Sequence, residues 1–178
     1  TILPSTTVTP GETVNAEVHI TGGNAPQDVG AIRFELETRA KTDEGHTDVD
    51  IDRFALTDSL TIEPDTEETR IVEFDIPYET PVTLGNTQVW IETELDIDLA
   101  VDPEDTDYLD VQPTPRLQAV FDAMDNLGFS FRTADCELDQ RGRYTAGHTF
   151  VQEFEFRPQS GPFVSALDEI ELIAQPAA

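Results

Sequence analysis

Residues 13–21 read Thr-Val-Asn-Ala-Glu-Val-His-Ile-Thr, and this short stretch decides the class of fold. Apolar side chains alternate with polar ones from Val14 to Ile20, which is the period of an extended strand with one buried face. Turn sequences stand on both sides, Thr-Pro-Gly at residues 9–11 and Gly-Gly-Asn at residues 22–24. The stretch therefore predicts a half-buried β-strand between two turns.

The same alternation recurs along the first 112 residues. It is found at residues 32–38 and 72–76, and further strands are expected near residues 89–95 and 109–111. Short strands punctuated by Pro and Gly, without helical crossovers between them, are typical of a β-sandwich rather than a parallel α/β sheet. We therefore expect an all-β fold, with a first sandwich domain over residues 1–112.

One helix is predicted over residues 115–127, at the start of a second domain. Thr114 can cap it, Pro115 suits its first turn and Gly128 suits its end. Its apolar side chains recur at helical spacing, at Leu117, Val120, Phe121, Met124 and Leu127. Because prolines flank the entry and alternation resumes only afterwards, we place the domain boundary near residue 113.

The second domain, residues 113–178, is predicted to be a β domain that begins with this helix. Strands are expected at residues 129–138, 149–156 and 163–173, the last with a bulge or bend between Leu167 and Ile170. A complete sandwich takes about 100 residues, which is more than this segment offers. We expect the domain either to be cut short at Ala178 or to lean on the first one.

Charge is the strongest feature of the composition. There are 37 Asp and Glu residues against 10 Lys and Arg, so the net charge is -27. Such a surface repels itself in dilute buffer, but at about 1 M salt the Debye length falls to roughly 3 Å and the repulsion is screened. The composition therefore predicts a halophilic protein. Its apolar content still lies above the level below which charged chains stay unfolded.

The composition also limits the partners and the location. Binding to nucleic acid needs clustered Lys and Arg, and the arginines here are scattered. The chain contains neither an apolar run of spanning length nor a secretory signal, so no stable membrane insertion is expected. Cys136 stands alone and can form no disulfide within the chain. We expect a cytoplasmic protein.

No catalytic residues and no cofactor are predicted. The three histidines, His19, His46 and His148, lie far apart in the sequence and form no zinc motif. No nucleophile elbow and no phosphate-binding glycine loop occurs. Cys136 lies in strand-like sequence and is expected to be a small buried residue.

An acidic stretch at residues 96–110 leaves two interpretations open. It is either a solvated loop or a site for a divalent cation, with ligands among Asp96, Asp98, Asp102, Asp105 and Asp107. An EF-type loop fits it badly, because Val101 stands where the turn needs glycine and Asp107 stands where the bidentate glutamate belongs.

Trp90 is out of phase with its apolar neighbours Val89 and Ile91. Either it covers the joint between the two domains, or it forms an exposed aromatic anchor for a partner, since Trp is enriched at binding hot spots. Trp90 and Tyr108 are accordingly the candidate interaction residues.

Four segments together resemble the sporulation-control protein M family. They are Asn-Thr-Gln-Val-Trp-Ile-Glu-Thr-Glu-Leu-Asp-Ile at residues 86–97, Ala-Val-Asp-Pro-Glu-Asp-Thr-Asp-Tyr-Leu at 100–109, Leu-Gln-Ala-Val-Phe-Asp-Ala-Met at 117–124, and Phe-Val-Gln-Glu-Phe-Glu-Phe-Arg-Pro-Gln-Ser-Gly-Pro-Phe at 150–163. Residues 8–14 and 20–24 look like the first hairpin of that family. The resemblance covers nearly the whole chain.

This resemblance implies an arrestin-like pair of β-sandwich domains and no catalytic residues. It also implies a non-enzymatic scaffold or regulator that engages other proteins through strand edges and loops. The partner is not identified by the sequence, and a homodimer is an open alternative. The acidity departs from bacterial members and points to a halophilic archaeon, which does not form spores, so the family name does not define the process. The rival hypothesis is a cation-dependent binding module built on residues 96–110.

Overall fold

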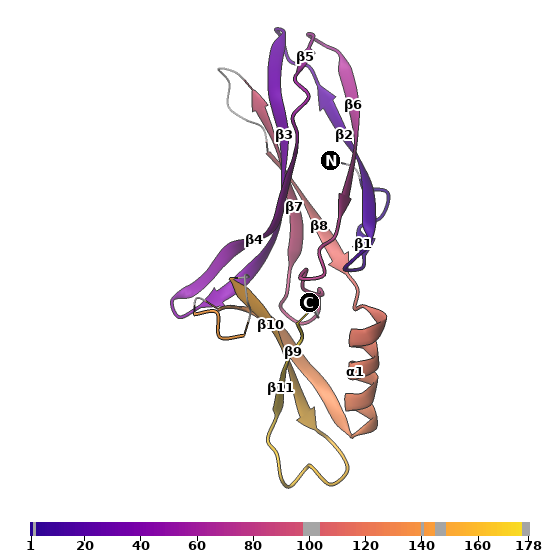
Figure 1. The fold of residues 1–178 in the computed structure, drawn as a ribbon, viewed down its shortest axis with the longest axis vertical. Coiled ribbons are helices and arrows are strands. Elements are labelled where there is room, and N and C mark those ends of the chain that lie inside the picture. Colours follow the sequence, from indigo (N-terminus) through magenta and orange to yellow (C-terminus); the bar gives the residue numbers. More distant parts are fainter. Residues whose placement is uncertain (2, 98–103, 140, 145–148, 176–178) are drawn as a thin grey trace.

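The computed structural model describes residues 1, 3–97, 104–139, 141–144 and 149–175 (Figure 1). Within the described residues the regular secondary structure is strand apart from one helix, which confirms the predicted all-β fold class. The elements are β1 (Thr7–Val8), β2 (Thr13–Thr21), β3 (Gln27–Thr42), β4 (Gly45–Leu56), β5 (Leu60–Ile62), β6 (Glu67–Asp75), β7 (Val89–Ile97), β8 (Glu104–Val111), α1 (Pro115–Asn126), β9 (Phe129–Leu138), β10 (Phe150–Pro158) and β11 (Ile170–Ile173).

Two sheets face each other in the first half of the chain. In one, β2 and β6 pair antiparallel over their full lengths, from Thr13 opposite Asp75 to Thr21 opposite Glu67. In the other, β3 pairs with β7 on one edge and with β4 and β5 on the other, and β7 continues to β8 and β1. Burial alternates strictly along β2, as its sequence predicts, because only one face of a sandwich strand meets the core.

A stack of three rings joins the two sheets. Phe34 of β3 stacks on Phe54 of β4 with centroids 4.8 Å apart, and Phe54 stacks on Phe74 of β6 at 4.7 Å. Burial of each ring contributes roughly 1.5–3 kcal/mol of transfer free energy. The stack therefore stabilises the packing of one layer on the other.

The long strand β3 connects this sandwich with the second half of the chain. Beyond its pairing with β7, it pairs in parallel with β9, at Ala40 opposite Cys136. From β9 the sheet continues through β10 to β11 (Figure 1). Strand β3 is thus shared by both halves, and the division into domains at residue 113 stays a prediction.

Helix α1 covers the β9–β10–β11 sheet. The ring of Phe121 lies 5.1 Å from that of Phe154 and 5.9 Å from that of Phe156. The hydroxyl of Thr114 accepts a hydrogen bond from the Leu117 N–H at 3.3 Å and caps the helix as expected. Gly128 follows the helix with a φ of +87°, a conformation that favours glycine.

The expected strand at residues 163–173 is wrong for its first part, since only Ile170–Ile173 forms a strand. Residues 162–166 form a turn, in which the Ala166 and Leu167 N–H groups donate to the carbonyl of Phe163. The Phe163 ring packs against Phe129, with centroids 5.5 Å apart. This packing holds the segment in a turn, which local alternation does not reveal. Within the described residues, no helix has the length and apolarity needed to cross a bilayer.

Candidate functional site

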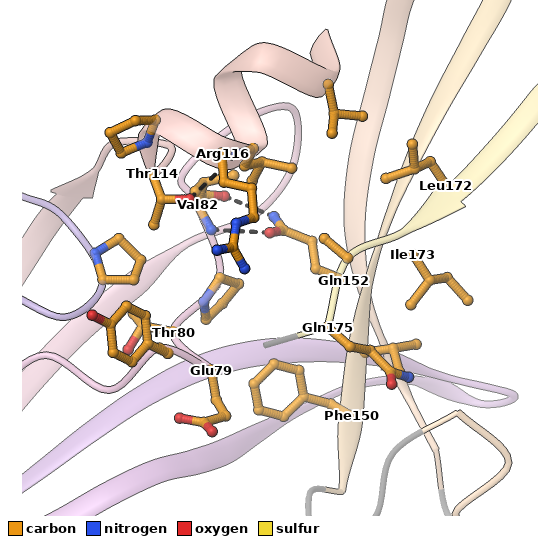
Figure 2. Close-up of a pocket in the computed structure, with 18 residues that line it drawn as sticks. Glu79, Thr80, Val82, Thr114, Arg116, Phe150, Gln152, Leu172, Ile173 and Gln175 are labelled. Carbon is orange, nitrogen blue, oxygen red and sulfur yellow. Dashed lines mark hydrogen bonds between the residues drawn. The ribbon is translucent and has the colours of Figure 1, made fainter. Parts of the chain in front are cut away.

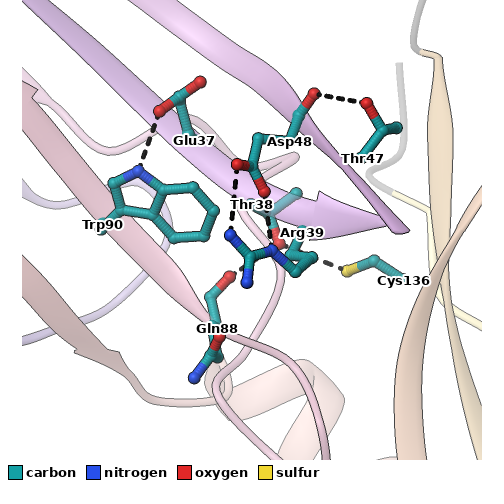
Figure 3. A network of polar contacts seen from close by, with 8 residues as sticks. All are labelled: Glu37, Thr38, Arg39, Thr47, Asp48, Gln88, Trp90 and Cys136. Carbon is teal, nitrogen blue, oxygen red and sulfur yellow. Dashed lines mark hydrogen bonds and ion pairs between the residues drawn. The ribbon is translucent and has the colours of Figure 1, made fainter. Parts of the chain in front are cut away.

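Trp90 lies on the outer face of the β3–β7 pair and is covered by polar side chains (Figure 3). Only 5% of it is exposed. Its indole Nε1 donates to Glu37 Oε2 at 2.8 Å, and the guanidinium of Arg39 lies over its ring at 5.6 Å from the centroid. Arg39 is held in turn by Asp48, which accepts from Nε at 2.7 Å and from Nη2 at 3.2 Å. The indole is therefore fixed in one orientation.

Tyr108 of β8 stands directly opposite Trp90 of β7 in the sheet. The two ring centroids are 6.0 Å apart, and Tyr108 is 59% exposed. The structure thus brings the two candidate interaction residues together, with Tyr108 presented to solvent and Trp90 beneath its neighbours. Their role in binding a partner stays a prediction.

Carboxylates gather beside Trp90. One oxygen from each of Glu35, Glu37 and Asp50 lies within 4.8 Å of the others. Arg53 bridges two of them, with Nε 3.3 Å from Glu35 and Nη2 2.7 Å from Asp50. Partial burial raises the pKa of Glu37, the Trp90 hydrogen bond lowers it, and the neighbouring carboxylates raise it further. This group was not predicted from sequence because only the β3–β4 register assembles it.

The acids predicted as cation ligands do not form such a group. Asp96 pairs with the guanidinium of Arg33, and Asp105 contacts the amino group of Thr1. Asp107 is partly buried, which raises its pKa. Asp98 and Asp102 lie outside the described residues. The described members therefore do not favour the cation-site alternative.

Cys136 is buried beside Thr38, whose hydroxyl donates to the sulfur at 3.6 Å. Burial raises the pKa of the thiol to about 11. A thiol with this pKa carries almost no thiolate at neutral pH, so Cys136 is a packing residue rather than a nucleophile there.

A groove of about 800 Å³ lies between residues 78–82, the first turns of α1, the start of β10 and the end of β11 (Figure 2). Its lining is largely apolar and includes Pro81, Val82, Leu117, Val120, Phe150 and Leu172. The groove was not predicted from sequence because its lining comes from five segments far apart in the chain, and no local pattern predicts that they meet.

Polar groups stand at defined places in this groove. Gln152 of β10 hydrogen-bonds the backbone of Val82 and the hydroxyl of Thr87. Thr80 is 4% exposed, and its hydroxyl has no hydrogen-bond partner among the described residues. Arg116, the second residue of α1, extends into the space between residues 78–82 and Gln152 (Figure 2). No described carboxylate lies within ion-pair distance of its guanidinium.

Comparisons with known proteins match one family over all or nearly all of the chain. The family model described as "SpoOM protein" matches residues 1–178. The sporulation-control protein Spo0M of Bacillus subtilis (strain 168) is 41% identical over 177 residues, which are 97% of this chain and 68% of that protein. The crystal structure of Spo0M from Bacillus subtilis matches with a TM-score of 0.91 and 39% identity, over 97% of this chain and 71% of that one. The structural match confirms the expected arrestin-like fold class.

Proposed function

This chain belongs to the SpoOM protein family, and from that premise we propose that it is a non-enzymatic scaffold that regulates other proteins by binding them. A regulatory role follows from its similarity to a sporulation-control protein. We infer that it binds these proteins through strand edges and the loops beside them. The single buried thiol fits a cytoplasmic location, in which we place the protein.

Open strand edges carry this proposal. In the described part of the chain β2 pairs only with β6 and β6 only with β2, so each strand leaves one edge of nine residues unpaired. An unpaired edge offers a row of main-chain donors and acceptors to an extended segment of another protein. On β6 the side chain of Ile71 is 72% exposed, which adds apolar surface beside such an edge. The pair therefore has both features that strand addition uses.

Affinity capture tests the proposal. The tagged chain is incubated with lysate of a salt-loving host, cross-linked at high salt throughout, and compared with Ile71→Asp beside the β6 edge. Val164→Asp is the matched control, because Val164 is also exposed, at 51%, but lies in the turn at residues 162–166.

We expect discrete proteins to be captured by the unmodified chain and by Val164→Asp, and to be lost with Ile71→Asp. Light scattering on the purified chain shows whether the bound partner is a second copy. If the chain neither enriches any protein nor self-associates, the proposal is overturned. If Ile71→Asp captures as much protein as the unmodified chain, the β6 edge is not the binding surface.

A further inference from the structure

The groove beside α1 combines a largely apolar lining, which also includes Glu79, with the guanidinium of Arg116, for which no ion pair is found among the described residues. Its volume of about 800 Å³ falls in the range of ligand-binding clefts, which is roughly 300–1,000 Å³. Val120, 37% exposed, and Tyr78, 67% exposed, extend apolar surface at its sides. In a protein of net charge -27, apolar surface left open next to an arginine is a candidate for recognition.

Two features at one end of the groove favour a carboxylate. Arg116 presents a planar guanidinium that can hold a carboxylate with two parallel hydrogen bonds. Arg116 is also the second residue of α1, where the helix dipole is positive and its own backbone N–H has no partner within the helix, while Pro115 has no N–H and the Leu117 N–H is capped by Thr114. Side chain and backbone therefore attract the same kind of group at the same place.

Other polar groups favour a peptide over a plain alkyl chain. The buried hydroxyl of Thr80 lacks a partner among the described residues, and the amide of Gln175 also lines the groove. Strand β11, whose last residues contribute Leu172 and Ile173 to the lining, pairs only with β10 in the described part of the chain. Its second edge is therefore available to main-chain hydrogen bonds, which an alkyl chain cannot make.

We propose that this groove binds the C-terminal segment of a partner protein, with apolar side chains in the groove and the terminal carboxylate on Arg116. The inference rests on the proposed function and names the part of the partner that is recognised. A chain terminus is the source we choose because it supplies one carboxylate without acidic side chains, which the surface charge of -27 would repel.

A matched pair of peptides tests the carboxylate. The probe is a fluorescein-labelled octapeptide of alternating valine and threonine that ends in leucine, prepared with a free C-terminus and as the C-terminal amide. Anisotropy gives the affinity of each, and methyl NMR of Val120 and Leu172 locates the site. We expect the acid to bind about tenfold more tightly than the amide, as for a charge-assisted bidentate pair.

Three variants assign the effect to the groove. Arg116→Gln should remove the preference for the acid, whereas Arg132→Gln should keep it, since Arg132 lies on β9 outside the groove and has no described ion pair either. Val120→Gln adds polarity to the groove without a charge beside Arg116, so it should weaken acid and amide alike. All three positions are exposed, so folding should be kept, and circular dichroism checks it.

Equal binding of acid and amide, no binding of either, or binding of decanoate as tight as that of the acid peptide would each overturn the inference. Partner capture by Arg116→Gln at the level of the unmodified chain would also overturn it while leaving the proposed function intact. Absence of any captured protein affects the proposed function alone, since the peptide measurements do not depend on it.

Discussion

The side-chain amide of Gln152 in β10 closes a pair of hydrogen bonds with the backbone of Val82. Its Oε1 accepts from the Val82 N–H at 2.9 Å, and its Nε2 donates to the Val82 carbonyl at 2.7 Å. Nε2 also donates to the hydroxyl of Thr87 at 2.9 Å. A single buried side chain thus ties the segment before β7 to β10, and it forms part of the groove lining.

Gln152→Leu should destabilise the fold, because the Val82 N–H loses its partner in a buried position, whereas the Val82 carbonyl still accepts from the Leu84 N–H. One unsatisfied buried group costs about 1–3 kcal/mol, so we expect the free energy of unfolding to fall by about that amount. Urea denaturation at constant KCl measures it, with Gln159→Leu on the exposed surface as the control. A loss below about 0.5 kcal/mol, as for an ordinary surface change, would contradict the role of Gln152.

Glu37→Gln should stabilise the protein at neutral pH. Burial and neighbouring carboxylates raise the pKa of Glu37, so the folded state holds this proton more tightly than the unfolded state. The contribution of this group to stability therefore falls as pH rises from its ordinary pKa through the raised one. Glutamine removes that loss while its oxygen still accepts from Trp90.

The control for this change is Glu73→Gln, which removes one charge from β6 without touching the Trp90 network. Melting temperatures at neutral and acidic pH decide the matter. Near pH 7 the melting temperature of Glu37→Gln should be higher than that of Glu73→Gln. This difference in melting temperature should vanish below the ordinary pKa of a glutamate, about 4.3. A lower melting temperature than that of Glu73→Gln at pH 7 would show that the charge on Glu37 is favourable.

The strands were predictable from sequence because, within one strand, alternate side chains face the core and the apolar residues follow the same alternation. The alternation from Val14 to Ile20 matches the burial along β2, and Thr114, Pro115 and Gly128 mark the ends of α1. These signals lie within a few residues of one another.

Trp90 and the groove were not predictable in the same way. Val89, Trp90 and Ile91 are all buried, so alternation fails there. Two of them face the core, whereas the indole is covered by Glu37, Arg39 and Tyr108 from neighbouring strands. Pairing across strands is a tertiary property, and so is the meeting of Val82 with Gln152.

Cys136 should resist alkylation in the folded protein. With a pKa of about 11, in place of the usual 9.0, its thiolate fraction near pH 8 is lower by about a hundredfold, and burial blocks the reagent as well. Because the folded-state pKa is the higher one, stability should also fall as pH rises from about 9 to about 11. Mass spectrometry after iodoacetamide treatment checks the first point, with the urea-unfolded chain as the reactive control. Similar rates for folded and unfolded chain would show that the thiol is accessible.

Salt should stabilise this protein, and one cross-strand pair should account for part of the effect. The β3–β7 register puts Glu35 directly opposite Glu92, and like charges in that position repel each other. Screening weakens the repulsion, since the Debye length falls from about 10 Å at 0.1 M salt to about 3 Å at 1 M. We therefore expect the melting temperature to rise between roughly 0.1 and 2 M KCl.

Glu92→Lys should reduce this salt dependence, because it replaces a repulsive pair by an attractive one. Its melting temperature should exceed that of the unmodified chain at low salt, and the gain should shrink towards 2 M KCl as screening weakens both kinds of pair. Glu73→Lys makes the same change in net charge opposite the neutral Asn15, so it reports the general effect of charge alone. If the melting temperatures of the two variants rise equally at low salt, repulsion between Glu35 and Glu92 makes no specific contribution to the salt dependence. If the melting temperature of the unmodified chain does not change with KCl, the surface charge of -27 does not limit stability, and the interpretation of the acidity as an adaptation to salt is wrong.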